Sequence, residues 1–221
     1  MLAFANRIDP VMREARRIVQ SPAIGKLYGM EMHLIADQTR LTRPAYHKTW
    51  TAQKARAGGG HLIWLGIHWL DLAAFISGSR ITRVAGFTGN VGGQPIDTED
   101  SAAITFQFAN GTLGSLTSGY YLDKGKHGFL KFWGANGWLE INQEHPAGPL
   151  AWQSHGQPIQ RWKPTTQGGY TPWVAHAVRA AEGKEPPALT ADESLQTLTV
   201  VFAAYRAAQT GISQSLRSEE R

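Results

Sequence analysis

The stretch GGGHLIWLGIHWLD, Gly58–Asp71, decides how this chain is interpreted. Three glycines open onto an apolar segment that is long enough for several helical turns. The segment places His61, Trp64 and His68 at helical spacing, and an aspartate closes it. Titratable side chains on an otherwise apolar helix are typical of a functional site, so we predict a helix that carries one.

The segments before this helix predict a helix followed by a strand. Asp9 and Pro10 mark a helix start, because aspartate caps free backbone N–H groups and proline suits the first turn. Alternating apolar residues then indicate a strand. The expected elements are a helix over residues 9–21, a strand over 26–35, a long loop over 37–57 and the central helix over 58–77.

Beyond Gly78 the hydrophobic period changes to two, which indicates strands. Asn110-Gly111 and Gly134–Gly137 are hairpin signals. The predicted strands cover residues 81–91, 101–108, 112–122, 126–133, 138–142, 150–153 and 158–162, and helices over 172–182 and 191–210 follow. This order predicts one α+β domain in which helices cover one face of an open, mainly antiparallel sheet.

The second face of that sheet is expected to need a partner. In Phe129–Trp133 and Trp138–Ile141 both alternating sets contain large apolar residues. One set can face the helices, which leaves the set with Trp133 and Trp138 uncovered. Two copies that pack face to face would form a two-fold dimer, and the alternative is that the last irregular segment folds over this face.

Composition limits the class of protein. The 221 residues include no cysteine, which excludes disulfides, thiolate metal sites and cysteine nucleophiles. No run approaches about 18 uninterrupted apolar residues and no signal peptide is evident, so we expect no membrane span and a cytoplasmic location. The net charge of +5 comes from scattered basic residues, which argues against nucleic-acid binding.

Each polar residue of the central helix also has a purely structural interpretation. His68 has the pKa range of a general acid or base, yet a helical histidine is more often a hydrogen-bonded structural residue. Asp71 lies within reach of His68 and either orients the imidazole or bonds a neighbouring backbone. A metal site of His61, His68 and Asp71 is disfavoured, because the two histidines are two turns apart rather than one.

Other signatures of catalysis or cofactor binding are missing from the sequence. It contains no Gly-x-Ser-x-Gly elbow, no Gly-x-Gly-x-x-Gly fingerprint and no Gly-x-x-x-x-Gly-Lys loop. We therefore expect neither a nucleophilic serine nor a nucleotide cradle. The acidic cluster Asp97–Asp100 is interpreted as a solvated strand entry, with a cation site as the alternative.

Seven segments, taken in order, resemble one family. They are Asn6–Pro10, Ser21–Lys26, the Gly58–Gly60 triplet with Gly66, His68 and Asp71, Thr98–Ala102, Phe108–Thr112, Ala191–Ser194 and Ala204–Ala207. The ordered set resembles the Gfo/Idh/MocA family of NAD(P)-dependent sugar oxidoreductases, named after glucose–fructose oxidoreductase, inositol dehydrogenase and rhizopine catabolism. The resemblance spans nearly the whole chain and is limited to the family's C-terminal domain.

The resemblance implies that two domains of a longer protein would have separate roles. Residues 9–221 would be a substrate-binding and oligomerisation domain, and residues 1–8 the end of a nucleotide-binding half. NAD or NADP is the expected cofactor of a full-length parent, whose Rossmann domain would carry the glycine-rich fingerprint and a catalytic lysine. This chain alone is expected to hold no cofactor and to be inactive. Its expected partners are a small-molecule substrate and further copies of itself, as a dimer or tetramer through the sheet face.

The resemblance also implies residue roles. His68 falls on the family's catalytic histidine, which accepts a proton from the substrate hydroxyl. Trp64 stands where the family usually has aspartate; it cannot accept a proton, but it can stack on a sugar ring. Trp50, Lys54 and Arg56 lie in the loop that borders the family's substrate pocket.

Two further residues are expected to assist, and other functions stay open. Arg7 lies where the two domains would join and is expected near the cofactor, while Asp71 would support His68. No metal is expected. The alternative function is a non-catalytic binding or assembly module that dimerises through the same sheet, which Trp64 in place of aspartate favours. A carbohydrate-binding domain with exposed tryptophans is a third possibility.

Overall fold

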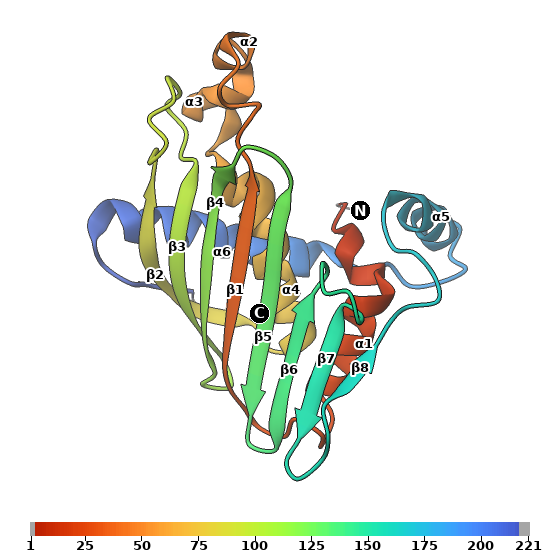
Figure 1. The fold of residues 1–221 in the computed structure, drawn as a ribbon. Coiled ribbons are helices and arrows are strands. Elements are labelled where there is room, and N and C mark those ends of the chain that lie inside the picture. Colours follow the sequence, from red (N-terminus) through yellow and green to blue (C-terminus); the bar gives the residue numbers. More distant parts are fainter. Residues whose placement is uncertain (1–2, 217–221) are drawn as a thin grey trace.

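The computed structural model describes residues 3–216 as a nine-stranded sheet packed against helices. The strand order is β8-β7-β6-β5-β1-β4-β3-β2-β9 (Figure 1). Within these residues β1 and β4 run parallel, and the other neighbouring pairs are antiparallel. The strands are β1 (Leu27–Asp37), β2 (Ile81–Gly89), β3 (Ser101–Phe108), β4 (Leu113–Leu122), β5 (Lys126–Gly134), β6 (Gly137–Asn142), β7 (Leu150–Ser154), β8 (Gln160–Trp162) and β9 (Gln214–Ser215).

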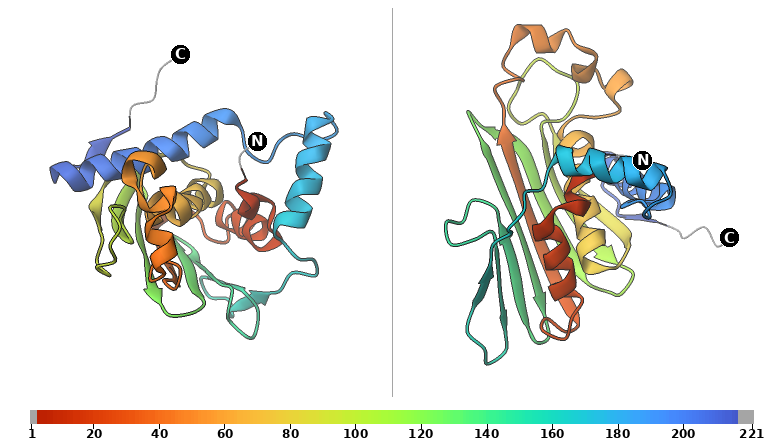
Figure 2. Two further views of the ribbon diagram at one scale, coloured as in Figure 1. Left: turned by 90° about the horizontal axis from the view of Figure 1, so that it is seen from above. Right: turned by 90° about the vertical axis from the view of Figure 1, so that its right-hand side faces the viewer.

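The helices form a second layer on one face of this sheet (Figure 2). They are η1 (Ala5–Ile8), α1 (Pro10–Val19), α2 (Pro44–His47), η2 (Trp50–Ala52), α3 (Lys54–Ala57), η3 (Leu62–Gly66), α4 (Ile67–Ser77), α5 (Tyr170–Ala181) and α6 (Ala191–Thr210). Of these, α1, α4 and α6 lie against the sheet, whereas α2 and α3 lie beyond one end of it (Figure 1). The predicted α+β class, with an open and mainly antiparallel sheet, is confirmed.

The first helix shows how the sequence builds this layer. The Asp9 side chain accepts a hydrogen bond of 2.8 Å from the backbone N–H of Val11, and Pro10 is the first helical residue, as predicted. The apolar residues fall on the face turned to the sheet: Val11, Met12, Ala15, Ile18 and Val19 are all buried. Burial of each larger side chain stabilises the fold by roughly 1.5–3 kcal/mol.

The segment between β1 and the central helix differs from its prediction. Residues 37–57 form three short helical pieces, α2, η2 and α3, rather than one open loop. Leu41 and Ala52 are 2% and 3% exposed, so the segment has small apolar anchors of its own. These anchors fix it at the end of the sheet where the central helix begins.

The sheet face away from the helices is open in the described part of the chain. Leu113 of β4 and Trp133 of β5 lie on this face on either side of Gly29, and they are 60% and 36% exposed. Together with Glu31 and Arg83 they line a groove of about 600 Å³. The segments predicted as strands over residues 150–153 and 158–162 lengthen the sheet as β7 and β8, and the alternative that the last irregular segment covers the open face stays a prediction.

One helical stretch, Lys54–Ser77, is long and apolar enough to cross a membrane by length and composition alone, a test that the core helix of a folded domain also passes. In this fold 67% of its most apolar window is buried. Packing against the sheet accounts for that hydrophobicity.

Candidate functional site

The glycine triplet starts the central helix because other segments approach its backbone closely. A Cβ at Gly59 would overlap the Tyr205 hydroxyl, and a Cβ at Gly60 would overlap the backbone of Glu99. The Glu99 carboxylate accepts hydrogen bonds from the backbone N–H groups of Gly60 (2.7 Å) and Leu62 (3.0 Å). The Tyr205 hydroxyl also donates to Glu99 (2.7 Å), so this carboxylate caps the helix and ties it to α6.

The acidic cluster before β3 therefore does not form a solvated strand entry. Thr98, Glu99 and Asp100 are 2%, 9% and 2% exposed. Asp100 accepts hydrogen bonds from the backbone N–H groups of Val91 (2.8 Å) and Gly92 (2.7 Å), which closes the β2–β3 loop. The prediction failed because it assumed that adjacent carboxylates would seek water, whereas backbone N–H groups satisfy them here.

The central helix widens before it reaches His68. Leu62–Gly66 form a π-helical turn in which the N–H of Ile67 donates to the carbonyl of Leu62, five residues earlier. The expected uninterrupted α-helix is thus replaced by a π-turn followed by α4. Such turns re-aim the residues that follow them and are frequent at functional sites.

His68 lies in the first turn of α4 and is partly buried. Its imidazole meets the ring of Phe4 edge-on, with centroids 5.2 Å apart and an interplanar angle of 89°. Burial lowers the pKa of His68, and the positive charge of Lys126 lowers it further. The imidazole is therefore neutral near pH 7, which is the form that can accept a proton.

Two tryptophans predicted as substrate contacts come together one turn before this histidine in the chain. Trp64 in the π-turn and Trp50 in η2 have ring centroids 5.5 Å apart, at an angle of 55°. They are 36% and 46% exposed, so both rings keep an accessible face. An exposed aromatic face with a nearby titratable group can hold the apolar face of a sugar ring.

Lys54 and Arg56 lie in α3, between Trp50 and the glycine triplet, and both are exposed. The backbone N–H of Lys54 donates to the Asp97 carboxylate, which anchors α3 to the β2–β3 loop. The two charged side chains are thus placed close in sequence to the aromatic pair, on a segment that the fold holds in position.

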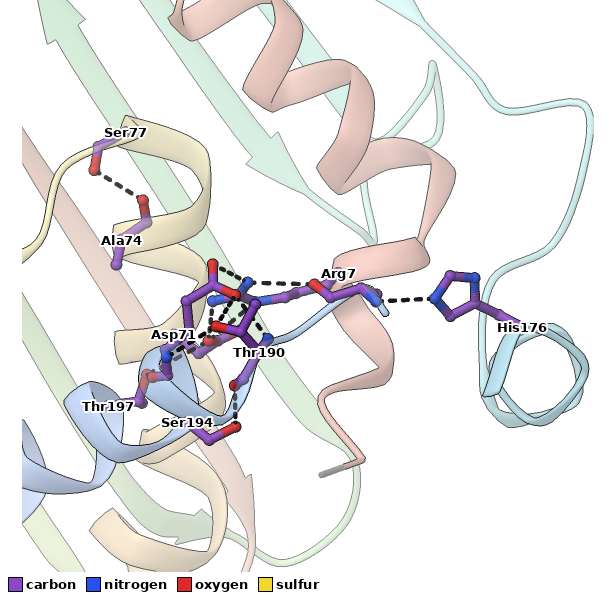
Figure 3. Close-up of polar contacts among 10 residues, drawn as sticks. Arg7, Asp71, Ala74, Ser77, His176, Thr190, Ser194 and Thr197 are labelled. Carbon is purple, nitrogen blue, oxygen red and sulfur yellow. Dashed lines mark hydrogen bonds and ion pairs between the residues drawn. The ribbon is translucent and has the colours of Figure 1, made fainter. Parts of the chain in front are cut away.

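Asp71 forms the centre of a buried ion-pair network (Figure 3). Its carboxylate accepts hydrogen bonds from Arg7 Nε (3.0 and 3.1 Å) and Nη2 (2.8 Å), and Thr197 Oγ1 makes a longer contact of 3.5 Å. Arg7 Nη1 donates to Glu193 Oε1 at 2.6 Å. Burial raises the pKa of Asp71, an effect that the hydrogen bond from Arg7 opposes.

This network determines the partners of two residues expected to assist the site, Asp71 and Arg7. The bonds of Asp71 go to Arg7 and Thr197 rather than to His68, so we assign it to fixing α4 against η1 and α6 instead of orienting the imidazole. Arg7 is 4% exposed with its guanidinium bonded to two carboxylates. These bonds give Arg7 a structural role in the described fold, and the cofactor contact expected of it stays a prediction.

His61, at the start of the π-turn, is fully buried. Its ring packs edge-on against Tyr120, with centroids 4.3 Å apart, and neither ring nitrogen has a hydrogen-bond partner among the described residues. Burial lowers its pKa to about 4. His61 belongs to the packing under the site.

The start of the central helix does not fit the phosphates of a nicotinamide dinucleotide. A phosphate cradle needs free backbone N–H groups at a helix N-terminus behind a parallel strand. The glycine-opened start of the central helix offers such groups, but those of Gly60 and Leu62 are bonded to the Glu99 carboxylate. A carboxylate at that position repels a phosphate.

Two residues that affect His68 were not predicted from the sequence. Lys126, at the start of β5, lies over the Trp69 ring at 4.5 Å and lowers the pKa of His68. Phe4 packs on the imidazole from a segment far away in sequence. No local pattern signals either contact, since both depend on how β5 and η1 meet α4.

A family model and a curated protein match parts of this chain. The family model described as the GFO/IDH/MocA C-terminal domain matches residues 12–140. A levoglucosan dehydrogenase of Pseudarthrobacter phenanthrenivorans is 28% identical over 137 residues, which make up 52% of this chain and 35% of that protein. The chain therefore spans about a third of this curated relative.

Solved structures share the fold at lower identity. The aldose-aldose oxidoreductase of Caulobacter crescentus, complexed with glycerol, has a TM-score of 0.80 and 23% identity, covering 98% of this chain and 63% of its own. The WlbA dehydrogenase of Bordetella pertussis, in complex with NADH and UDP-GlcNAcA, has a TM-score of 0.76 and 18% identity over 98% of this chain and 63% of its own. Both proteins are thus longer than the part they share with this chain.

Proposed function

This chain belongs to the GFO/IDH/MocA family through its C-terminal domain, and on that premise we propose that it is the substrate-binding part of an NAD(P)-dependent oxidoreductase acting on a sugar, a polyol or a related hydroxy compound. The observation that carries the proposal is the neutral, partly buried imidazole of His68 on the same helical stretch as Trp64, whose exposed ring pairs with that of Trp50. The levoglucosan dehydrogenase relative supports the substrate class, because its substrate is a sugar derivative.

His68 is the proposed acid/base. A neutral imidazole accepts the proton of a substrate hydroxyl as that carbon is oxidised, and returns it in the reverse direction. The edge of Phe4 limits the motion of the ring, and the charge of Lys126 disfavours protonation before substrate arrives. The task of these residues is to hold the hydroxyl and take its proton.

Trp64 changes the site relative to the family pattern. An indole offers no acceptor for a hydroxyl group, so a sugar would be held here by stacking and not by a carboxylate. Trp50 supplies the second ring. This substitution also motivates the second candidate function, a non-catalytic binding or assembly module that keeps the fold and the sugar contact.

The oxidant would be NAD or NADP held by residues other than these 221. Gly60 and Leu62 have their N–H groups bonded to Glu99, so we expect these residues alone neither to bind the dinucleotide tightly nor to turn over substrate. Calorimetric titration with NAD and NADP measures this. A micromolar dissociation constant for these 221 residues would contradict the expectation.

The open face of the sheet is the proposed oligomer interface. Leu113 and Trp133 present apolar surface around a groove that the described chain leaves uncovered. A flat apolar face of this kind is the usual place for a second copy to pack. The proposal is a dimer or tetramer built through this face.

Sugar binding tests the proposed function directly. Saturation-transfer NMR with glucose and myo-inositol as probes should show transfer from protein to ring protons, and Trp64→Ala should abolish it. Tyr170→Ala is the matched control, because Tyr170 is 68% exposed and lies on α5. Absence of transfer from the unmodified chain to either probe would contradict the proposal, and equal loss in the control would contradict the assignment to Trp64.

A further inference from the structure

One end of the sheet carries an excess of positive charge. Figure 1 shows that α2, α3 and the turn from β4 into β5 all lie at this end. Six exposed side chains from these segments form what we call the cationic patch: Arg43, Lys48, Lys54, Arg56, Lys124 and Lys126. None of the ion pairs found among residues 3–216 includes a member of this patch.

Carboxylates at the same end do not neutralise the patch. Asp37 accepts a hydrogen bond of 2.6 Å from the N–H of Thr39, Asp97 accepts one from the N–H of Lys54, and Asp123 accepts one of 3.0 Å from a glutamine side chain. These three negative charges compare with seven positive charges at this end, the six of the patch and that of Arg40. Positive charge therefore remains in excess where water and ligands have access.

Segments distant in sequence contribute to one electrostatic environment. The hydrogen bond from Thr39 lowers the pKa of Asp37, and the charges of Arg43 and Lys124 lower it further. Those two cations come from the α2 segment and the β4–β5 turn. Since Lys126 also acts on His68, the patch reaches from α2 to the proposed base.

The carboxylates under the site also accept hydrogen bonds from other parts of the fold. Asp71 is bonded to Arg7, Glu99 to the start of the central helix, and Asp100 to the β2–β3 loop. At the position where the family usually has an aspartate, the chain has Trp64. These three carboxylates are thus held by partners within the fold, whereas the lysine and arginine side chains of α3, which follows Trp50 in the chain, are exposed.

We infer that the sugar recognised at this site carries an oxyanion, a carboxylate or a phosphate, which the cationic patch binds while the tryptophan pair stacks on the ring. The inference rests on the proposed function and names its substrate class. Lys54 and Arg56 are the members closest in sequence to Trp50, in the short helix α3. Lysine and arginine are the side chains suited to carboxylate and phosphate groups.

The test compares three ligands that share one ring. D-Glucose, D-glucuronate and D-glucose 6-phosphate are titrated into the 221-residue chain in dilute buffer, and binding is followed by tryptophan fluorescence. Repeating the titrations with Trp50→Phe assigns the signal to the site. At least one acid should bind about tenfold more tightly than glucose, and added salt should reduce that ratio, since salt screens exposed charges. The stronger of the two acids identifies the oxyanion.

Two double variants distinguish an effect of the cationic patch from an effect of the protein's overall charge. Lys54→Gln/Arg56→Gln should reduce the preference for the acid over glucose about fivefold or more. Lys163→Gln/Arg206→Gln removes the same charge from exposed positions in other parts of the fold and should leave the preference intact.

The outcomes separate the two proposals. Equal binding of all three ligands, or an equal effect of both double variants, overturns the inference and leaves the proposed function standing. Failure of every ligand to bind overturns the proposed function as well. Tighter binding of an acid, lost only in the Lys54/Arg56 variant, supports the inference.

Discussion

Phe4 lies edge-on to the imidazole of His68, with ring centroids 5.2 Å apart. The segment that carries Phe4 is fixed three residues later, where Arg7 is bonded to Asp71 on the same helix as His68. The surroundings of the proposed base therefore depend on a buried ion pair one turn along α4. This relationship links the stability of the fold to the state of the site.

The ion pair predicts a large loss of stability on removal of one partner. Arg7→Ala should lower the free energy of unfolding by about 3–5 kcal/mol, because it leaves the Asp71 carboxylate buried and unpaired. Arg17→Ala is the control, since its pair with Glu14 is exposed and should contribute less than about 1 kcal/mol. Urea unfolding followed by circular dichroism measures both free energies. Losses of equal size would show that the buried pair contributes no more to stability than the exposed pair.

The close approach of other segments to the glycine triplet predicts that alanine in the triplet destabilises the fold more than alanine at an open glycine position. Gly60→Ala should destabilise the fold by at least about 2 kcal/mol, since its Cβ would overlap the backbone of Glu99. Gly89→Ala should be nearly neutral, because the nearest atom to its Cβ is a Val91 methyl at an ordinary 3.8 Å. If thermal unfolding midpoints of the two variants agreed, the close approach of Glu99 would be refuted.

His61 predicts a loss of stability in acid. Burial lowers its pKa to about 4, whereas in the unfolded chain it lies near 6.5. The unfolded state then binds the proton first, so the stability is complete above pH about 6.5 and falls by about 3 kcal/mol as the pH drops to about 4. His61→Phe should remove this dependence and, with no unpartnered ring nitrogens to bury, stabilise the fold at pH 7.5 by about 1 kcal/mol.

Urea unfolding of both proteins at pH 7.5 and pH 5 tests that account. The difference between variant and unmodified chain isolates His61 from the other histidines. A difference that does not grow between these two pH values would count against a neutral, buried imidazole.

The open sheet face predicts association. Sedimentation should show a dimer or larger species, and Trp133→Arg should convert it to monomer by placing an unpaired charge in the apolar contact. Tyr170→Arg changes an exposed aromatic residue on α5, away from this face, and should leave the assembly unchanged. A monomer at every concentration of the unmodified chain would refute the proposed interface.

The fold could be predicted from the sequence because its signals are local. The capped start at Asp9-Pro10, the Asn110-Gly111 hairpin and the period-two strands each depend on neighbouring residues, and they set the layers together. The segment 37–57 could not, since its short helical pieces depend on anchors such as Leu41 packing under the end of the sheet.

The candidate site was predictable in part. The spacing of Trp64 and His68 placed them on one helical stretch, and the structure adds Trp50 beside Trp64. The partners of Asp71 were not predictable, because Arg7 meets it only after η1 packs on α4. Long-range pairing of this kind leaves no periodic trace in a sequence.

The imidazole of His68 is the most direct test of the proposed function. Two-dimensional NMR of the histidine ring protons, assigned with His68→Gln, measures its pKa with and without glucose, glucuronate or glucose 6-phosphate. We predict a pKa below the ordinary 6.5 in the free chain, because of burial and Lys126, and a shift of the His68 resonances on addition of at least one of these sugars. A pKa at or above 6.5, with resonances that no sugar moves, would contradict the assignment of His68 as the proton acceptor of a sugar site.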